Sequence, residues 1–266
     1  MTPLVKIGNV YFKREDFNLT GSAKDRSISL QVLNLVKQKY LSAVISSTGN
    51  AAISAQYYCA KYGINLTIFV SPHTEKSKLK LIANYIVSDK PVSDAFKFAK
   101  SNHSYLLRQS TDPVALIGYG KIATEIIKQL PQVSSIFVPI GSGTTLLGIS
   151  LKLPNSIPIF GVQPASYCPI ASVFDQEYIP EKNTITDALG VKLLPLKNQI
   201  IKTINSHKGL GIIVQNEEVI NAKNYLISNN INTSPEGALT LAGLNKINDL
   251  SNIGQFPVII LTGAKR

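Results

Sequence analysis

The chain alternates short apolar runs, rich in β-branched residues, with longer segments whose apolar residues recur at helical spacing. Strands are predicted over residues 10–13, 43–46, 66–70, 135–140, 157–162, 212–214 and 258–261. Helices are predicted over residues 24–40, 51–62, 93–101, 118–129, 217–229 and 235–247. A regular alternation of strand and helix produces a mainly parallel sheet with helices on both faces. The sequence therefore predicts an α/β fold.

The length of the chain allows one domain or two closely packed domains. With 266 residues, of which 44% are hydrophobic and 16% charged, the chain can bury most of the surface that its unfolded form exposes. A long amphipathic helix ends near Pro131, and a new strand, loop and helix follow it. We therefore expect two α/β domains with open, twisted, mainly parallel sheets and a cleft between the domains.

Charge, hydropathy and cysteine usage argue against several classes of protein. The formal net charge is +11, but the 27 Lys and Arg residues are scattered along the chain, so nucleic acid is not the expected partner. A positive field would instead concentrate an anionic cofactor or substrate. No apolar run approaches the length of a membrane span, and Thr2 to Val10 lacks the pattern of a signal peptide. Because Cys59 and Cys168 fit no metal or disulfide spacing, we expect a soluble, reduced, cytoplasmic protein without a bound metal.

A glycine-rich turn follows the fourth predicted strand. It consists of Gly141, Ser142, Gly143, Thr144 and Thr145 and leads into an apolar helical segment. The backbone amides of such a turn, together with its hydroxyls, are the donors that a phosphate group needs. The spacing fits neither a Walker A loop nor a dinucleotide-binding fingerprint. Taken alone, the turn can also be an ordinary packing device.

A second loop of similar chemistry joins the second predicted strand to the next helix. In its residues Ser47, Thr48, Gly49, Asn50 and Ala51, hydroxyls, a glycine and the first amides of a helix converge. Such a loop forms an anion site of the size of a carboxylate. Ordinary capping of the helix by Ser, Thr or Asn is the simpler alternative.

Two single residues complete the set of candidates. Lys24 begins a predicted helix, where the positive end of the helix dipole favours a neutral, nucleophilic amine. Thr262 ends the last predicted strand, and ligands of open parallel sheets gather beyond the carboxyl ends of the strands. The simpler alternatives are a surface lysine and a plain strand end.

Taken together in their order along the chain, which is Lys24, residues 47–51, residues 141–145 and Thr262, the four features resemble the fold-type II pyridoxal-phosphate enzymes of the tryptophan synthase β superfamily. The similarity extends from Thr2-Pro-Leu4 to Thr262-Gly263. It implies pyridoxal 5'-phosphate as cofactor, a small amino acid as substrate, a homodimer, and an active site between the domains. It also implies a larger cofactor-binding domain formed by residues 1–34 and 128–266, and a smaller mobile domain formed by residues 35–127.

The resemblance implies a role for each candidate residue. Lys24, in a stretch similar to the family's NPTGSFKDR, would hold the cofactor as a Schiff base and then serve as the base that takes the α-proton. Asn50 would bond the phenolic oxygen of the cofactor, and Thr262 would face its pyridine nitrogen. The phosphate would bind Gly141, Ser142, Gly143, Thr144 and Thr145. The substrate carboxylate would bind Ser47, Thr48, Gly49, Asn50 and Ala51. A hydroxyl facing the pyridine nitrogen does not keep it protonated, which suits elimination or replacement at the β- or γ-carbon.

Within the family, the details favour threonine synthase, which converts O-phosphohomoserine to threonine and phosphate. The Ser-Thr-Gly-Asn form of the loop at residues 47–50 supports this prediction, as does Gly118 to Ile126, which is similar to the family's GYKTIAYEI. Two positions depart from the pattern. Ala115 stands where threonine synthases place an arginine for the substrate phosphate, unless Arg108 or a nearby lysine substitutes, and Ala51 stands where a threonine is common.

Three alternatives to threonine synthase stay open. The segments Thr186-Asp-Ala-Leu-Gly190 and Asp112-Pro113 are closer to serine or threonine dehydratases. A cysteine-synthase-like β-replacement enzyme is the second alternative. The third is a non-catalytic cofactor-binding subunit, in which Lys24 would form no chromophore.

Overall fold

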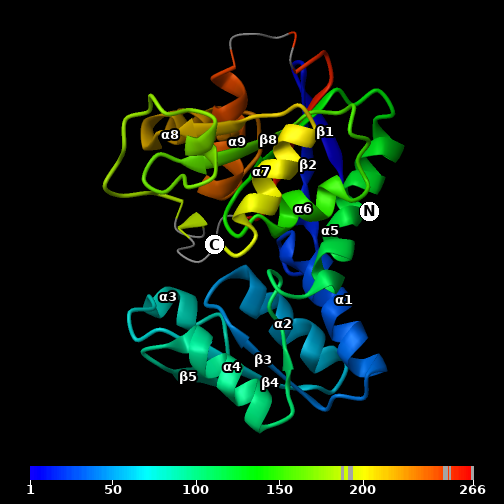
Figure 1. The fold of residues 1–266 in the computed structure, drawn as a ribbon, viewed down its shortest axis with the longest axis vertical. Coiled ribbons are helices and arrows are strands. Elements are labelled where there is room, and N and C mark those ends of the chain that lie inside the picture. The colour runs from blue at the N-terminus through cyan, green and yellow to red at the C-terminus, as the bar shows by residue number, and fades with distance from the viewer. Residues whose placement is uncertain (187–188, 191–193, 248–250, 252, 265–266) are drawn as a thin grey trace. The chain divides into compact units, whose positions relative to one another are not determined.

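The computed structural model describes residues 1–186, 189–190, 194–247, 251 and 253–264 (Figure 1). The chain divides into two compact units. The first unit consists of Met1–Ala23 and Tyr119–Arg266, and the second is the continuous segment Lys24–Gly118. The divisions predicted at residues 34 and 128 lie further along helices α1 (Lys24–Lys37) and α5 (Pro113–Gln129).

The first unit contains a six-stranded sheet in the order β1-β2-β10-β7-β8-β9. Its strands are β1 (Leu4–Ile7), β2 (Val10–Arg14), β7 (Ser135–Pro139), β8 (Ile159–Pro164), β9 (Gly211–Val214) and β10 (Pro257–Leu261). Its helical elements besides the end of α5 are η1 (Glu15–Phe17), α6 (Thr144–Ser150), η2 (Ala171–Val173), α7 (Lys197–Ser206), α8 (Asn216–Ser228) and α9 (Pro235–Asn245). β1 and β2 pair antiparallel, and the other described pairs of this sheet are parallel.

Helices cover both faces of this sheet. Successive residues of a strand point to opposite faces. A side chain at Gly161 of β8 would meet Ile204 of α7, whereas the neighbouring Val162 lies against Gly243 of α9. The strands β7, β8 and β10 are buried along their whole length, which explains their continuous apolar sequences.

The second unit contains a four-stranded parallel sheet in the order β5-β4-β3-β6. Its strands are β3 (Ser42–Ser46), β4 (Asn65–Val70), β5 (Tyr85–Val87) and β6 (Tyr105–Leu106). Its helices besides α1 and the start of α5 are α2 (Asn50–Lys61), α3 (Lys76–Leu79) and α4 (Pro91–Ser101). Ala43 and Ile45 pack in one apolar cluster with residues of α1 and α2, while Val44 packs with Ala95 of α4 in another. Helices therefore cover both faces of this sheet as well.

The predicted fold class, with two mainly parallel sheets and helices on both faces, is confirmed. All seven predicted strands and all six predicted helices are present, with ends that differ by a few residues. The elements that the periodicity missed are short or polar, namely β1, β5, β6, α3 and α7. Among the described residues, no helix is both long enough and apolar enough to cross a membrane.

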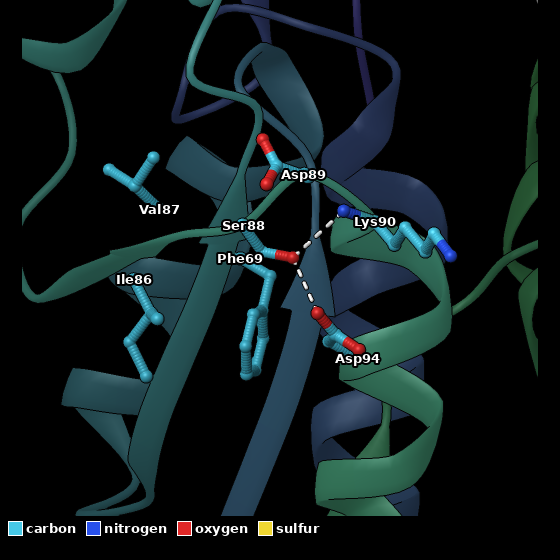
Figure 2. Close-up of a pocket in the computed structure, with 7 residues that line it drawn as sticks. All are labelled: Phe69, Ile86, Val87, Ser88, Asp89, Lys90 and Asp94. Carbon is cyan, nitrogen blue, oxygen red and sulfur yellow. Dashed lines mark hydrogen bonds between the residues drawn. The ribbon is translucent and has the colours of Figure 1, made fainter.

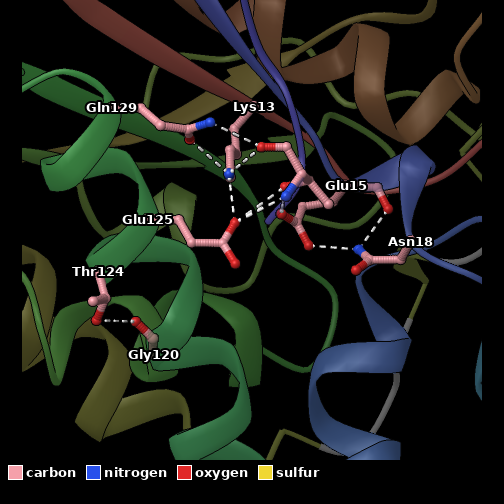
Figure 3. Close-up of polar contacts among 8 residues, drawn as sticks. Lys13, Glu15, Asn18, Gly120, Thr124, Glu125 and Gln129 are labelled. Atoms are coloured by element: carbon pink, nitrogen blue, oxygen red, sulfur yellow. Dashed lines mark hydrogen bonds and ion pairs between the residues drawn. The ribbon is translucent and has the colours of Figure 1, made fainter.

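A buried lysine connects β2 to α5 in the first unit (Figure 3). Lys13 is fully buried, and its Nζ donates to the carbonyl oxygen of Thr2 at 2.8 Å, to Glu125 Oε2 at 2.7 Å and to Gln129 Oε1 at 2.8 Å. An ammonium has three N–H donors, so these three acceptors satisfy it. A buried charge is tolerated only when it is paired and hydrogen-bonded in this way.

A half-buried carboxylate joins helices and a strand in the second unit. Asp112 Oδ1 accepts from the backbone N–H of Val114 at 2.9 Å in the first turn of α5. Asp112 Oδ2 accepts from Gln31 Nε2 of α1 at 2.7 Å and from the Tyr105 hydroxyl of β6 at 2.6 Å. Burial, and then the hydrogen bond to Asp112, raise the pKa of Tyr105 to about 12. One side chain therefore holds three elements together.

Replacing Lys13 by Met should lower the free energy of unfolding by about 3 kcal/mol, because it breaks the buried ion pair with the half-buried Glu125. Urea unfolding measures this loss. Lys246→Met is the matched control, since the Lys246–Glu218 pair lies in the same unit but is exposed. That control should cost less than about 1 kcal/mol. Equal losses in the two variants would contradict the importance of the buried pair.

Replacing Tyr105 by Phe should destabilise the protein in a pH-dependent way. Because the folded protein raises the Tyr105 pKa from 10.0 to about 12, the neutral hydroxyl contributes its full stability below about pH 10 and loses it as the pH rises towards 12. We expect a loss of about 1–3 kcal/mol near pH 8 that shrinks above pH 10. Urea unfolding across this range is the measurement, with exposed Tyr85→Phe as control. A loss that stays constant to pH 12 would refute the interpretation.

Candidate functional site

The glycine-rich turn lies at the carboxyl end of β7 in the first unit. Gly143 has a φ of +79° and precedes the first residue of α6. This left-handed conformation favours glycine. A Cβ atom at this position would also lie 2.0 Å from Ile200 Cδ1 of α7. The Ser142 and Thr144 hydroxyl oxygens lie 3.0 Å apart, within hydrogen-bond distance. The sharp turn therefore depends on glycine and gathers two hydroxyls.

The donors of this turn fit a phosphate group. Within the described part of the chain, no backbone amide from Gly141 to Leu146 donates to a protein acceptor. Ser142 and Thr145 are half-buried and Thr144 is buried. Amides that lack a protein partner, together with hydroxyls, are the donor set that binds phosphate oxygens. The residues present therefore suit the phosphate of the implied cofactor.

Thr262 lies at the same edge of the sheet as this turn. β10 runs parallel to β7 with Val258 opposite Ile136 and Ile259 opposite Phe137. Continued in this register, Thr262 is level with Ile140, the residue before the turn. The Thr262 side chain is half-buried, and its hydroxyl has no hydrogen-bond partner among the described residues. The structure thus brings two of the predicted site elements together.

Two further segments meet β10 just beyond its end. The Gly263 carbonyl oxygen accepts from the Ser234 amide at 3.1 Å and from the Thr233 hydroxyl at 3.1 Å. The Thr262 carbonyl oxygen accepts from the Ala23 amide at 2.9 Å, and Ser22 forms a β-bridge with Gly263. Ala23 is the residue directly before Lys24. The first residue of α1 is therefore one peptide bond from a residue that is anchored to the end of β10.

In the second unit, the residues predicted to bind a carboxylate connect β3 to α2. The helix begins at Asn50, one residue before the predicted start. Its N-cap residue is Gly49, which makes no side-chain cap, and the Ser47 hydroxyl accepts from the Gly49 amide at 3.3 Å. Ordinary side-chain capping is therefore not what the structure contains. Ala51 is buried, whereas Ser47, Thr48 and Asn50 are half-buried.

Lys24 and Asn50 begin two helices that are packed together within the second unit. Lys24 is the first residue of α1 and is half-buried. Its neighbour Asp25 accepts a hydrogen bond of 2.6 Å from the Ser54 hydroxyl, one turn after Asn50 on α2. The N-terminal parts of α1 and α2 are therefore in contact, and these are the helix ends that carry Lys24 and the loop of residues 47–51.

The positions that the resemblance connects with a substrate phosphate do not offer a free cationic side chain. Ala115 is fully buried in α5, so its position offers no cationic side chain for a substrate phosphate. The Arg108 guanidinium lies 5.0 Å from the centre of the Phe96 ring, and its Nε donates to the Ser110 hydroxyl at 3.1 Å. Arg108 is therefore held by neighbours of its own. In the dehydratase-like segment 186–190, Asp187 and Ala188 lie outside the described residues.

The sequence motifs did not identify every residue at the end of β10 or at the contact between α1 and α2. A helix was predicted from residue 235 without a role in the site, and the structure places its N-cap residue, Ser234, beside Gly263. Asp25 lies in the motif around Lys24, but no role was predicted for it, and Ser54 lies in no motif. The two residues are 29 positions apart and meet only through helix packing. The sequence indicated only that one helix starts at Lys24 and another directly after Asn50.

A hollow of about 510 Å³ in the second unit contains none of the predicted site residues (Figure 2). It is lined by Phe69, Ile86, Val87, Ser88, Asp89, Lys90 and Asp94. The Ser88 hydroxyl donates to Asp94 at 2.5 Å and accepts from the Lys90 amide at 3.0 Å. These polar groups are satisfied by one another. Among the described residues, no group of His, Cys, Asp or Glu side chains is arranged to hold a metal ion.

Several known proteins have sequences or folds similar to those of this chain. The family model described as "Pyridoxal-phosphate dependent enzyme" matches residues 1–263. The catabolic L-threonine dehydratase of Staphylococcus aureus (strain USA300) is 28% identical over 275 residues, which cover 93% of this chain and 79% of that protein. The biosynthetic L-threonine dehydratase of Pasteurella multocida (strain Pm70) is 26% identical over 278 residues, covering 97% of this chain and 54% of that protein. The structure of maize serine racemase has the same fold, with a TM-score of 0.87 at 21% identity over 100% of this chain and 88% of that one.

Proposed function

The chain belongs to the family of pyridoxal-phosphate-dependent enzymes, and on this premise we propose that it is a serine or threonine dehydratase. Such an enzyme removes water from a hydroxy amino acid and yields ammonia and a keto acid. The family uses pyridoxal 5'-phosphate as its cofactor. The reaction class is therefore elimination or replacement on an amino acid, and the proposal concerns which substrate is used.

The burial of Ala115 is the observation that favours a dehydratase over threonine synthase. Threonine synthase needs a cation for the phosphate of its substrate, and the position where the resemblance places an arginine holds a fully buried alanine. Arg108 already contacts Phe96 and Ser110. The relatives named as threonine dehydratases support the same choice. The dehydratase alternative is thus better supported than threonine synthase, which the sequence alone favoured.

The residues at the sheet edge suit the cofactor as follows. The amides and hydroxyls of Gly141 to Thr145 would hold its phosphate, and the Thr262 hydroxyl would face the ring nitrogen. Lys24 would hold it covalently through Nζ, and Asn50 would contact its phenolic oxygen. These assignments, and the expected homodimer, are predictions. When bound, the cofactor supplies an electron sink for the charge that develops at the α-carbon.

The remaining chemistry is assigned to side chains and amides of this chain. The first amides of α2, with Ser47 and Thr48, would bind the substrate carboxylate and orient the α-carbon. Lys24 Nζ, freed when the substrate amine replaces it, would take the α-proton as a general base. The β-hydroxyl would leave as water together with a proton, and the unsaturated amine that results would tautomerise to an imine, which water hydrolyses to ammonia and the keto acid. No cationic side chain for a phosphorylated leaving group is required.

The Lys24→Ala variant should lack the visible absorption band that a lysine-bound cofactor gives to the purified protein. Lys37→Ala is the matched control, because Lys37 is an exposed residue in the last turn of the same helix. Borohydride reduction followed by peptide mass spectrometry should place the cofactor mass on the peptide that contains Lys24. An unchanged spectrum in Lys24→Ala would remove the basis for its covalent role.

A side-by-side assay of serine, threonine, O-phosphohomoserine and O-acetylserine tests the choice of substrate. We expect ammonia and a keto acid from serine or threonine, with turnover at least about tenfold above that of the other two substrates, since a site built for one leaving group discriminates by its polar contacts. The Lys24→Ala variant serves as the blank. Release of phosphate with formation of threonine from O-phosphohomoserine would overturn the proposal in favour of threonine synthase.

A further inference from the structure

One face of α2 is directed at the first turn of α1. Asn50, Ser54 and Tyr58 follow one another at intervals of four residues, so they lie on the same side of the helix. Ser54 is fully buried, and the Asp25 side chain of α1 is almost completely buried opposite it. The residue predicted to contact the cofactor, Asn50, is therefore the first of a row that continues along the contact between the two helices.

The contact between the two helices is a short hydrogen bond to a carboxylate. The Ser54 hydroxyl donates to Asp25 Oδ1 at 2.6 Å, which is the length of a charge-assisted bond. Tyr58, one turn further along α2, has its pKa raised to about 12, by burial first and by the nearby negative charge of Asp25 second. The Asp25 carboxylate therefore faces α2 at the level of Ser54 and Tyr58.

The first turn of α1 is also closely packed on its other side. A Cβ atom at Gly118 of α5 would lie 2.0 Å from the backbone carbonyl oxygen of Arg26. Glycine is required here because the two backbones approach so closely. The turn that begins with Lys24 is therefore held by α5 at Arg26 and by α2 at Asp25. Its position is set by contacts that do not involve the Lys24 side chain itself.

The burial of Asp25 exceeds what helix stability requires. An acidic residue in the first turn of a helix stabilises that helix even when it is exposed to solvent. Burying a carboxylate is unfavourable unless hydrogen bonds offset the loss of water. A buried, directional contact instead specifies one arrangement of the groups that it joins. Here those groups are the helix starts that carry Lys24 and Asn50.

We propose that Asp25 is a positioning residue that, through its hydrogen bond from Ser54, sets the place of Lys24 relative to Asn50 and the loop of residues 47–51. The inference rests on the proposed function, because it assigns Lys24 Nζ to the cofactor and to the α-proton. Asp25 does not touch the substrate. It keeps the amine within reach of the reacting atom while the loop amides hold the substrate carboxylate.

Two serine variants test this proposal. Ser54→Ala removes the donor to Asp25, and Ser42→Ala removes a hydroxyl contact of the same length, 2.6 Å to Ser104, in the same unit but at the opposite end of β3. Both should lower the melting temperature, Ser54→Ala by more, because it leaves a buried carboxylate with one donor fewer. Only Ser54→Ala should lower kcat for serine or threonine, by about tenfold, with KM within about twofold, because misplacing a catalytic group by less than 1 Å slows the reaction without weakening carboxylate binding.

A second measurement does not depend on turnover. Apoprotein mixed with pyridoxal phosphate should develop the lysine-bound absorption band about tenfold more slowly in Ser54→Ala than in wild type, and at the wild-type rate in Ser42→Ala. If Ser54→Ala does not fold, Ser54→Cys keeps the shape with a weak S–H donor and should show a smaller loss in the same direction.

The outcomes separate the two proposals. Equal kcat and equal rates of band formation in the Ser54 and Ser42 variants would overturn the role of Asp25. A wild-type protein that forms the band but converts neither serine nor threonine would overturn only the proposed dehydratase, since the rate of band formation still tests Asp25. A fall in kcat matched by an equal rise in KM in Ser54→Ala would also count against positioning.

Discussion

The backbone hydrogen bonds at the end of β10 are the constraint on which the candidate site depends. Gly263 pairs with Ser22 and accepts from the Ser234 amide, and the Thr262 carbonyl oxygen accepts from the Ala23 amide. These bonds join three segments that are widely separated in the chain. β10 lies between β2 and β7 in the sheet, so its carboxyl end is also beside the glycine-rich turn. Ligand sites of parallel sheets form at such edges because the loops after neighbouring strands converge there.

Hydrogen-bonded charged side chains fix how neighbouring elements pack. Buried Lys13 joins β2 to α5 in the first unit, while half-buried Asp112 and buried Asp25 join helices to one another in the second. Hydrophobic burial is non-directional and scales with area. A charged side chain with little access to water, in contrast, must meet its donors or acceptors at defined distances and angles, so each of these residues favours one register of packing.

The residues proposed to bind the cofactor and those that bear on the proposed substrate follow different physical rules. The proposed phosphate turn depends on amides and on glycine, and Thr262 would contribute a neutral hydroxyl. Such groups favour elimination or replacement in general and do not distinguish between hydroxy amino acids. The proposed choice of substrate rests instead on charges that are absent or already engaged, as at Ala115 and Arg108. Motif agreement in the first set therefore could not settle the reaction, and it pointed towards threonine synthase.

The sequence by itself determined the α/β class, seven strands, six helices and the loops of residues 47–51 and 141–145, because hydrophobic periodicity and glycine-rich turns are local properties. It missed β5 and β6, since strands of three and two residues carry too little periodicity to detect. Only the tertiary structure decided that the start of α9 lies beside Gly263, that Ala115 is buried, and that Asp25 meets Ser54. These facts depend on how distant elements pack against one another, and no short stretch of sequence encodes that arrangement.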